Sequence, residues 1–84
     1  MPTITTASGF SMTVSDEELA AITAARIKGS LLVQTSYIYQ TDYLSPKKII
    51  IFYDVNLSKI LERPVVTNRL SEIEDELRQH FGIS

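Results

Sequence analysis

"LLVQTSYIYQTDYLSPKKIIIFYDV", residues 31–55, decides the fold of this chain because it holds the longest apolar run and most of the aromatic residues. Its first ten residues are rich in β-branched and aromatic types that alternate between two faces, which predicts a strand over 31–40. Residues 49–53 are apolar at every position, as is typical of a strand covered on both faces. Pro46 lies between the two runs and cannot donate to a sheet ladder. We therefore expect an antiparallel pair of strands joined by a loop over 41–47.

A helix is predicted before this stretch. Ser15 with Glu18 has the form of a capping box, in which the serine oxygen caps one backbone N–H and the glutamate caps another. Acidic residues in the first turn also suit the positive end of the helix dipole. Gly29 is a natural C-cap, so the helix is expected to span about 16–28.

The N-terminal residues alternate in the manner of a strand. Polar and apolar side chains alternate over residues 10–14, which predicts a strand there. Residues 3–6 continue the pattern before a short glycine-containing link, so the two segments are candidates for a hairpin. The alternative is that residues 1–9 form a flexible tail or an edge strand.

Two helices are expected after residue 55. Asn56 suits the cap of a short helix over 57–62, which Pro64 would end. The clearer helix is C-terminal, because its apolar residues recur at spacings of four, three, four and four. These residues are Val66, Leu70, Ile73, Leu77 and Phe81.

The expected fold is a single small α+β domain over residues 1–84. Its element order is β(β)-α-β-β-(short α)-α. An antiparallel β-sheet with two main helices packed on one face is the natural way for these elements to bury their apolar sides.

Composition excludes several classes of function. The chain has no cysteine, which removes disulfides and thiolate metal sites. Its net charge of -2 disfavours binding to nucleic acid through phosphate neutralisation. The first 18 residues lack the basic and apolar regions of a secretory signal, and no apolar stretch approaches the roughly 20 residues that a membrane span needs. A cytoplasmic location and no contact with a membrane are therefore expected.

The residues that could carry chemistry are few. His80 is the only histidine, and its place in the last turn of a helix suits an exposed residue better than a catalytic base. Glu72 and Glu76 are one turn apart, but we interpret the acids of that run as the solvated side of an amphipathic helix rather than a metal site. The three glycines are isolated, so a glycine-rich phosphate-binding loop is not expected. We expect no enzyme activity, no cofactor and no metal.

The tyrosines are the candidate binding residues. Tyrosine offers a wide ring with a polar tip, which suits protein interfaces, although the same rings can simply cap the edge of a core. The sequence therefore predicts a non-enzymatic protein-interaction module, a small intracellular regulator, inhibitor or accessory subunit, with a protein partner, a homodimer, or both. The alternative is a single-stranded nucleic-acid-binding domain whose tyrosines stack on bases. The partner-binding residues are expected to be Tyr37, Tyr39, Tyr43 and Tyr53, with Lys47 and Lys48 on the rim.

Overall fold

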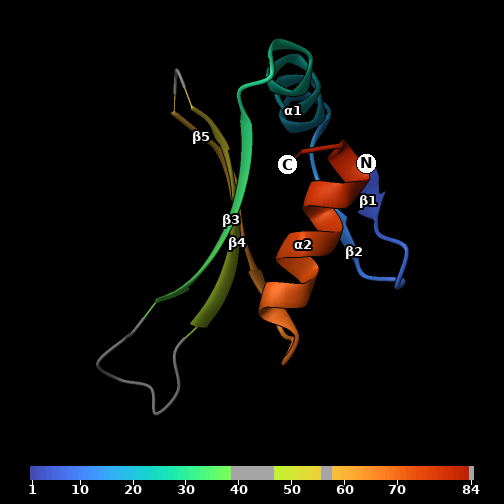
Figure 1. The fold of residues 1–84 in the computed structure, drawn as a ribbon, viewed down its shortest axis with the longest axis vertical. Coiled ribbons are helices and arrows are strands. Elements are labelled where there is room, and N and C mark those ends of the chain that lie inside the picture. The colour runs from blue at the N-terminus through green and yellow to red at the C-terminus, as the bar shows by residue number, and fades with distance from the viewer. Residues whose placement is uncertain (39–46, 56–57, 84) are drawn as a thin grey trace.

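Three consecutive strands form the larger of two antiparallel sheets, in the order β3-β4-β5 (Figure 1). The strands are β3 (Leu31–Ile38), β4 (Lys47–Asp54) and β5 (Ser58–Val65). The computed structural model describes residues 1–38, 47–55 and 58–83. The antiparallel pairing of β3 with β4 is confirmed, and it places Val33 opposite Phe52. The predicted loop at 41–47 lies almost wholly outside the described residues.

The N-terminal residues form a hairpin of their own. Strands β1 (Thr3–Thr5) and β2 (Ser11–Thr13) pair antiparallel, with Ile4 opposite Met12. Gly9 in the turn has a φ of +95°, which a residue without a side chain adopts at little cost. The hairpin prediction is confirmed, but the hairpin is a separate two-stranded sheet rather than part of the larger one.

Helix α1 (Asp16–Lys28) begins and ends where the sequence predicts. The Glu18 backbone N–H donates to the Ser15 hydroxyl oxygen at 3.1 Å, and the Ser15 N–H donates to the Glu18 carboxylate at 2.8 Å. These two bonds form the capping box. Gly29 ends the helix with a left-handed φ of +74°.

Helix α2 (Leu70–Phe81) starts one turn later than its apolar spacing predicts. Val66 continues the spacing in sequence, but it is fully exposed and precedes the helix. The other four apolar residues of the pattern are buried, so the predicted face is correct from Leu70 onward.

The predicted short helix over 57–62 is wrong, because residues 58–65 form strand β5. Pro64 is expected from the sequence to end that helix, but it lies within this strand, opposite Ile49. A proline is compatible with a strand at the edge of a sheet, where its missing N–H need not serve a ladder. Leu61 points into the core from β5 and is buried.

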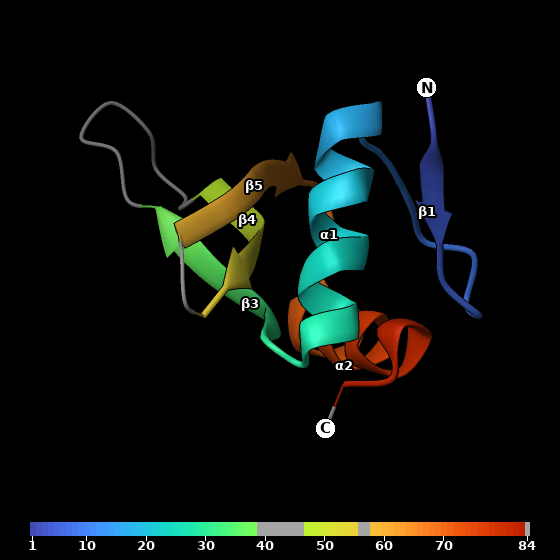
Figure 2. The same ribbon diagram turned by 90° about the horizontal axis from the view of Figure 1, so that it is seen from above.

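The helices lie between the two sheets. Figures 1 and 2 show α1 and α2 on the same side of the β3-β4-β5 sheet, with the β1-β2 hairpin on the far side of the helices. The expected arrangement of helices on one sheet face is therefore only partly right, since the helices also support a second layer. The apolar core draws on all three layers through Ile4, Met12, Val14, Ile22, Ala25, Leu31, Val33, Ile50, Phe52, Leu61, Leu70, Ile73, Leu77 and Phe81.

Strand β4 is buried on both faces, as its unbroken apolar run predicts. Ile50 and Phe52 point toward the helices and are fully buried. Ile49 and Ile51 point to the opposite face and are 3% and 8% exposed. Among the described residues, no helix packs on that opposite face (Figure 2).

Two side chains of α2 occupy the free edge of β3. The Glu74 carboxylate accepts hydrogen bonds from the Thr35 backbone N–H at 2.7 Å and from the Thr35 hydroxyl at 3.0 Å. Arg78 donates to the Val33 carbonyl at 3.4 Å and pairs with Glu74 at 3.0 Å. These groups stand where a neighbouring strand would bond, and an edge protected in this way resists pairing with another chain.

Replacing Glu74 with alanine should destabilise the chain. The Glu74→Ala substitution leaves a half-buried N–H without its charged acceptor, which typically lowers the free energy of unfolding by about 1–3 kcal/mol. The matched control is Asp75→Ala on the same helix, because Asp75 is exposed and its ion pair with Arg78 stabilises by about 0.5 kcal/mol or less. Urea unfolding followed by circular dichroism measures both. Equal losses in the two variants would contradict the assigned role.

Candidate functional site

The three-stranded sheet has an inner face toward the helices and an outer face away from them. Successive side chains of a strand point to opposite faces. Tyr37 shares the inner face with the buried Val33, whereas Tyr53 follows Phe52 and points to the outer face. Tyr37 and Tyr53 therefore lie on opposite faces and near opposite ends of the β3-β4 ladder.

The predicted tyrosine surface is thus divided in the described part of the chain. Tyr37, 49% exposed, pairs across the ladder with Lys48 on the inner face. Lys47 pairs with Ile38 on the outer face, at the end of the ladder far from Tyr53. Tyr39 and Tyr43 lie outside the described residues, so their place relative to these side chains stays a prediction.

Tyr53 belongs to an apolar patch on the outer face. We call Leu32, Tyr53 and Val55 the outer-face patch. Leu32 lies directly opposite Tyr53 in the ladder and is 38% exposed, and Val55 is 61% exposed. These three side chains line a groove of about 300 Å³, which Lys59 of β5 also lines.

Sequence reasoning did not single out Leu32 or Val55. Leu32 stands between two core residues, Leu31 and Val33, in a segment whose side chains alternate between two faces. The signal was the two-residue period of the strand, which places Leu32 on the face that carries Gln34. Val55 follows the end of β4, and no periodicity marks it as exposed.

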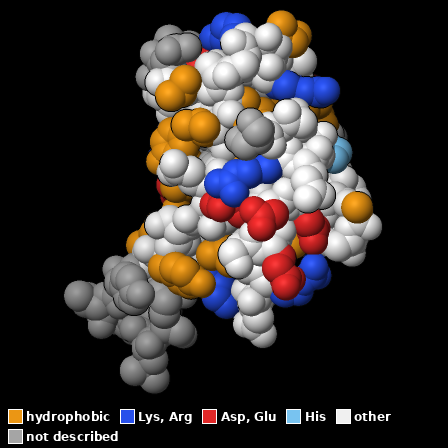
Figure 3. Space-filling view, viewed as in Figure 1, with side chains coloured by type: hydrophobic (Ala, Val, Ile, Leu, Met, Phe, Trp, Pro, Cys, Tyr) orange, Lys and Arg blue, Asp and Glu red, His pale blue; other side chains and the backbone are white. Residues whose placement is uncertain are grey.

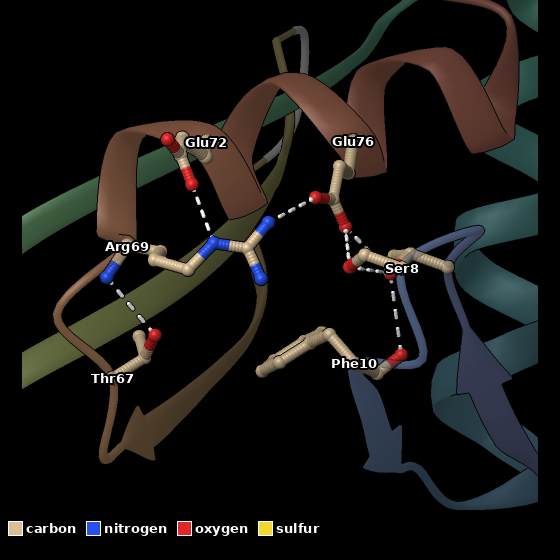
Figure 4. Close-up of polar contacts among 7 residues, drawn as sticks. Ser8, Phe10, Thr67, Arg69, Glu72 and Glu76 are labelled. Carbon is tan, nitrogen blue, oxygen red and sulfur yellow. Dashed lines mark hydrogen bonds and ion pairs between the residues drawn. The ribbon is translucent and has the colours of Figure 1, made fainter.

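A polar cluster joins α2 to the turn of the hairpin (Figure 4). The Glu76 carboxylate accepts hydrogen bonds from the hydroxyls of Ser8 and of the buried Thr6, the latter at 2.7 Å. Arg69 donates to Glu76 at 3.0 Å and to Glu72 at 2.5 Å. No pattern in the sequence links Thr6 to Glu76, because they are 70 positions apart.

The cluster holds Glu76 in its charged form. Hydrogen bonds from Ser8 and Thr6, together with the Arg69 guanidinium, keep the pKa of Glu76 below the ordinary glutamate value of 4.5. A carboxylate with a lowered pKa accepts hydrogen bonds but does not serve as a proton donor at neutral pH. The arrangement therefore supports a role in packing α2 against the hairpin.

Glu18 acts in the same way on α1. Its pKa is lowered by the Ser15 backbone N–H and by the guanidinium of Arg63 on β5, with which it forms an ion pair. The carboxylate thus caps α1 and also ties the helix to the sheet. The acids of 72–76 are only partly a solvated face, because Glu74 and Glu76 are half-buried and bonded to strands or turns.

The other residues considered for chemistry show no convergent arrangement. His80 is exposed, and its ring meets the neighbouring Phe81 ring edge-on at 4.8 Å. Within residues 1–38, 47–55 and 58–83, no group of three or more histidine, cysteine, aspartate or glutamate side chains is placed to hold a metal ion.

The stability of the chain should fall with acid as Glu76 becomes protonated. A group whose pKa is lower in the folded state stabilises it above its unfolded pKa of about 4.5, and this contribution is lost as pH falls through the folded-state value. The Glu76→Gln variant should therefore have a lower urea midpoint than the natural chain at about pH 7. The difference should shrink at about pH 3. A difference that stays constant between these two pH values would contradict this role of the carboxylate.

No described helix is long and apolar enough to cross a membrane. No family model, curated protein or solved structure matches this chain.

Proposed function

We propose that the chain is a non-enzymatic protein-interaction module that binds a protein partner through the outer-face patch. The observation that carries this proposal is the exposure of Leu32, Tyr53 and Val55 beside one groove, on a sheet face that no described helix covers. Apolar side chains that gather on an exposed surface are characteristic of sites of protein association.

The composition of the patch supports a protein partner. Tyr53 supplies an aromatic ring with a polar tip, which is enriched at interfaces. Leu32 and Val55 surround it with aliphatic surface, and Lys59 provides a charged rim. An apolar centre with a polar border is the usual arrangement of a binding interface.

The exposed side of α2 is a less suitable contact surface. Figure 3 shows acidic and basic side chains crowded over this helix, whereas hydrophobic side chains gather along the left side, where the three-stranded sheet lies. The acidic side chains of α2 already pair with Arg78 of the same helix or with Arg69, which precedes it. The surface that masks or scaffolds a partner is therefore the three-stranded sheet rather than α2.

Polar substitutions in the patch should weaken binding to the partner without unfolding the chain. Leu32→Ser combined with Val55→Ser should weaken the affinity for the partner at least about tenfold, because each buried aliphatic side chain contributes about 1.5–3 kcal/mol. The matched control is Ile27→Ser, since Ile27 is 81% exposed on α1 and lies outside the patch. The partner is first isolated from the native host with the natural chain as bait. Its affinity for all three proteins is then measured by calorimetry, with circular dichroism as the folding check.

Other outcomes would contradict the proposal. Equal affinity in the double variant and the control would show that the patch is not the contact. Capture of an oligonucleotide whose affinity falls steeply with salt would favour the nucleic-acid alternative, in which Tyr53 stacks on a base. Sedimentation at two concentrations distinguishes a second copy of the chain from a different protein as the occupant.

A further inference from the structure

The edge strands of the two sheets are a further surface to which an extended chain can bind. An edge strand presents unpaired N–H and C=O groups that can pair with an extended chain. Along a strand of an antiparallel ladder, the backbone N–H and C=O groups of alternate residues bond to the neighbouring strand, and those of the residues between them point away from it. The edge of β3 is already occupied, because Glu74 and Arg78 bond to the outward groups of Thr35 and Val33.

The edge of β5 is also poorly suited to pairing with a new strand. The backbone groups of Val33 and Thr35 point away from β4. The backbone groups of their partners on β4, Phe52 and Ile50, therefore point toward β5. The register of β4 with β5 then places the backbone groups of Glu62 and Pro64 at the free edge of β5. Pro64 has no N–H to offer, and the Glu62 carbonyl accepts from Arg63 at 3.0 Å.

The edge of β2 is open. The Thr6 N–H donates to the Phe10 carbonyl at 2.8 Å, and the Val14 N–H donates to the Pro2 carbonyl at 3.0 Å. These bonds fix the alternation of the hairpin, so the backbone groups of Ser11 and Thr13 point away from β1. No described residue hydrogen-bonds to those groups, which leaves two donors and two acceptors at strand spacing.

This open edge borders a groove. A hollow of about 550 Å³ lies between β2 and the end of β5, and its walls are consecutive residues of the two segments. Figure 4 shows the Phe10 side chain extending from the start of β2 toward the end of β5. The residues that line the groove are Phe10, Ser11, Met12, Thr13, Arg63, Pro64, Val65 and Val66.

The groove is almost uncharged. Arg63 is the one ionisable residue of the lining, and its guanidinium pairs with Glu18 of α1. The remaining side chains of the lining are apolar or carry only a hydroxyl group. Charge complementarity therefore favours a neutral occupant with apolar side chains.

We propose that the β2-β5 groove binds an extended, uncharged peptide segment of a partner protein, which adds as a strand to β2. Its backbone bonds to the outward groups of Ser11 and Thr13, and its alternate side chains contact the apolar wall formed by Pro64, Val65 and Val66. Strand addition of this kind takes its affinity from main-chain hydrogen bonds and its specificity from alternate side chains. The site is separate from the outer-face patch, so it stands whether or not that patch binds a protein.

The test uses a synthetic peptide of sequence Thr-Val-Thr-Val-Thr, acetylated and amidated at its ends, added to the ¹⁵N-labelled full chain. NMR should show peptide-dependent shifts of the Ser11 and Thr13 amide signals. Thr13→Pro removes one outward N–H and leaves the bonds to β1 intact, so it should weaken peptide binding at least about tenfold. Thr3→Pro is the matched control, because Thr3 pairs with Thr13 and its N–H points from the opposite edge of the hairpin.

The peptide offers a second test that does not depend on the folding of a variant. Methylating the amide nitrogens of alternate residues removes the donors on one edge, and one of the two alternations should therefore abolish the shifts. The proposal is overturned if neither methylated peptide binds more weakly than the parent. It is equally overturned if the parent peptide leaves the Ser11 and Thr13 signals unmoved, or if Thr13→Pro and Thr3→Pro bind alike.

Discussion

The contact between Phe52 and Phe81 is the point on which the rest of the structure depends. Phe52 is fully buried in the second half of β4, and the Phe81 ring meets it edge-on at 5.7 Å with an interplanar angle of 87°. This geometry is favoured for aromatic pairs and adds to the free energy gained from burying both rings. In a chain without a disulfide, the alignment of α2 on the sheet relies on such packing.

Helix carboxylates then fix the layers around this core. Glu18 connects α1 with β5, Glu74 connects α2 with the edge of β3, and Glu76 connects α2 with the hairpin turn. Each of them accepts a hydrogen bond from a backbone N–H or a hydroxyl group and also faces an arginine. Ordinary ion pairs at a protein surface contribute little, but half-buried, multiply bonded carboxylates give the layers a defined orientation.

Local chemistry made much of the fold predictable. The capping box at Ser15 and the left-handed Gly29 gave the bounds of α1, and the two apolar runs gave the β3-β4 pair. Strand β5 was missed because Pro64 suggests the end of a helix, and only its place on an edge shows that a strand can hold it. The second sheet was missed as a separate layer because its position depends on the distant Thr6-Glu76 contact.

The candidate site was less predictable than the fold. Tyr37 and Tyr53 are close to the same apolar stretch, but the two-residue period of strands sends them to opposite faces. The outer-face patch depends on which face the helices leave open, and the open edge of β2 depends on hydrogen-bond alternation. Both are properties of the assembled layers, and no short segment of sequence contains them.

The strand connectivity has a consequence for the speed of folding. Every strand in the described part of the chain pairs only with a strand next to it in sequence, β1 with β2, β3 with β4, and β4 with β5. Forming each strand pair therefore closes a short loop at low entropic cost. The two sheets can form independently of each other, each starting at its turns. The slow step should be the docking of α2 against the hairpin, since it brings residues near the two termini together.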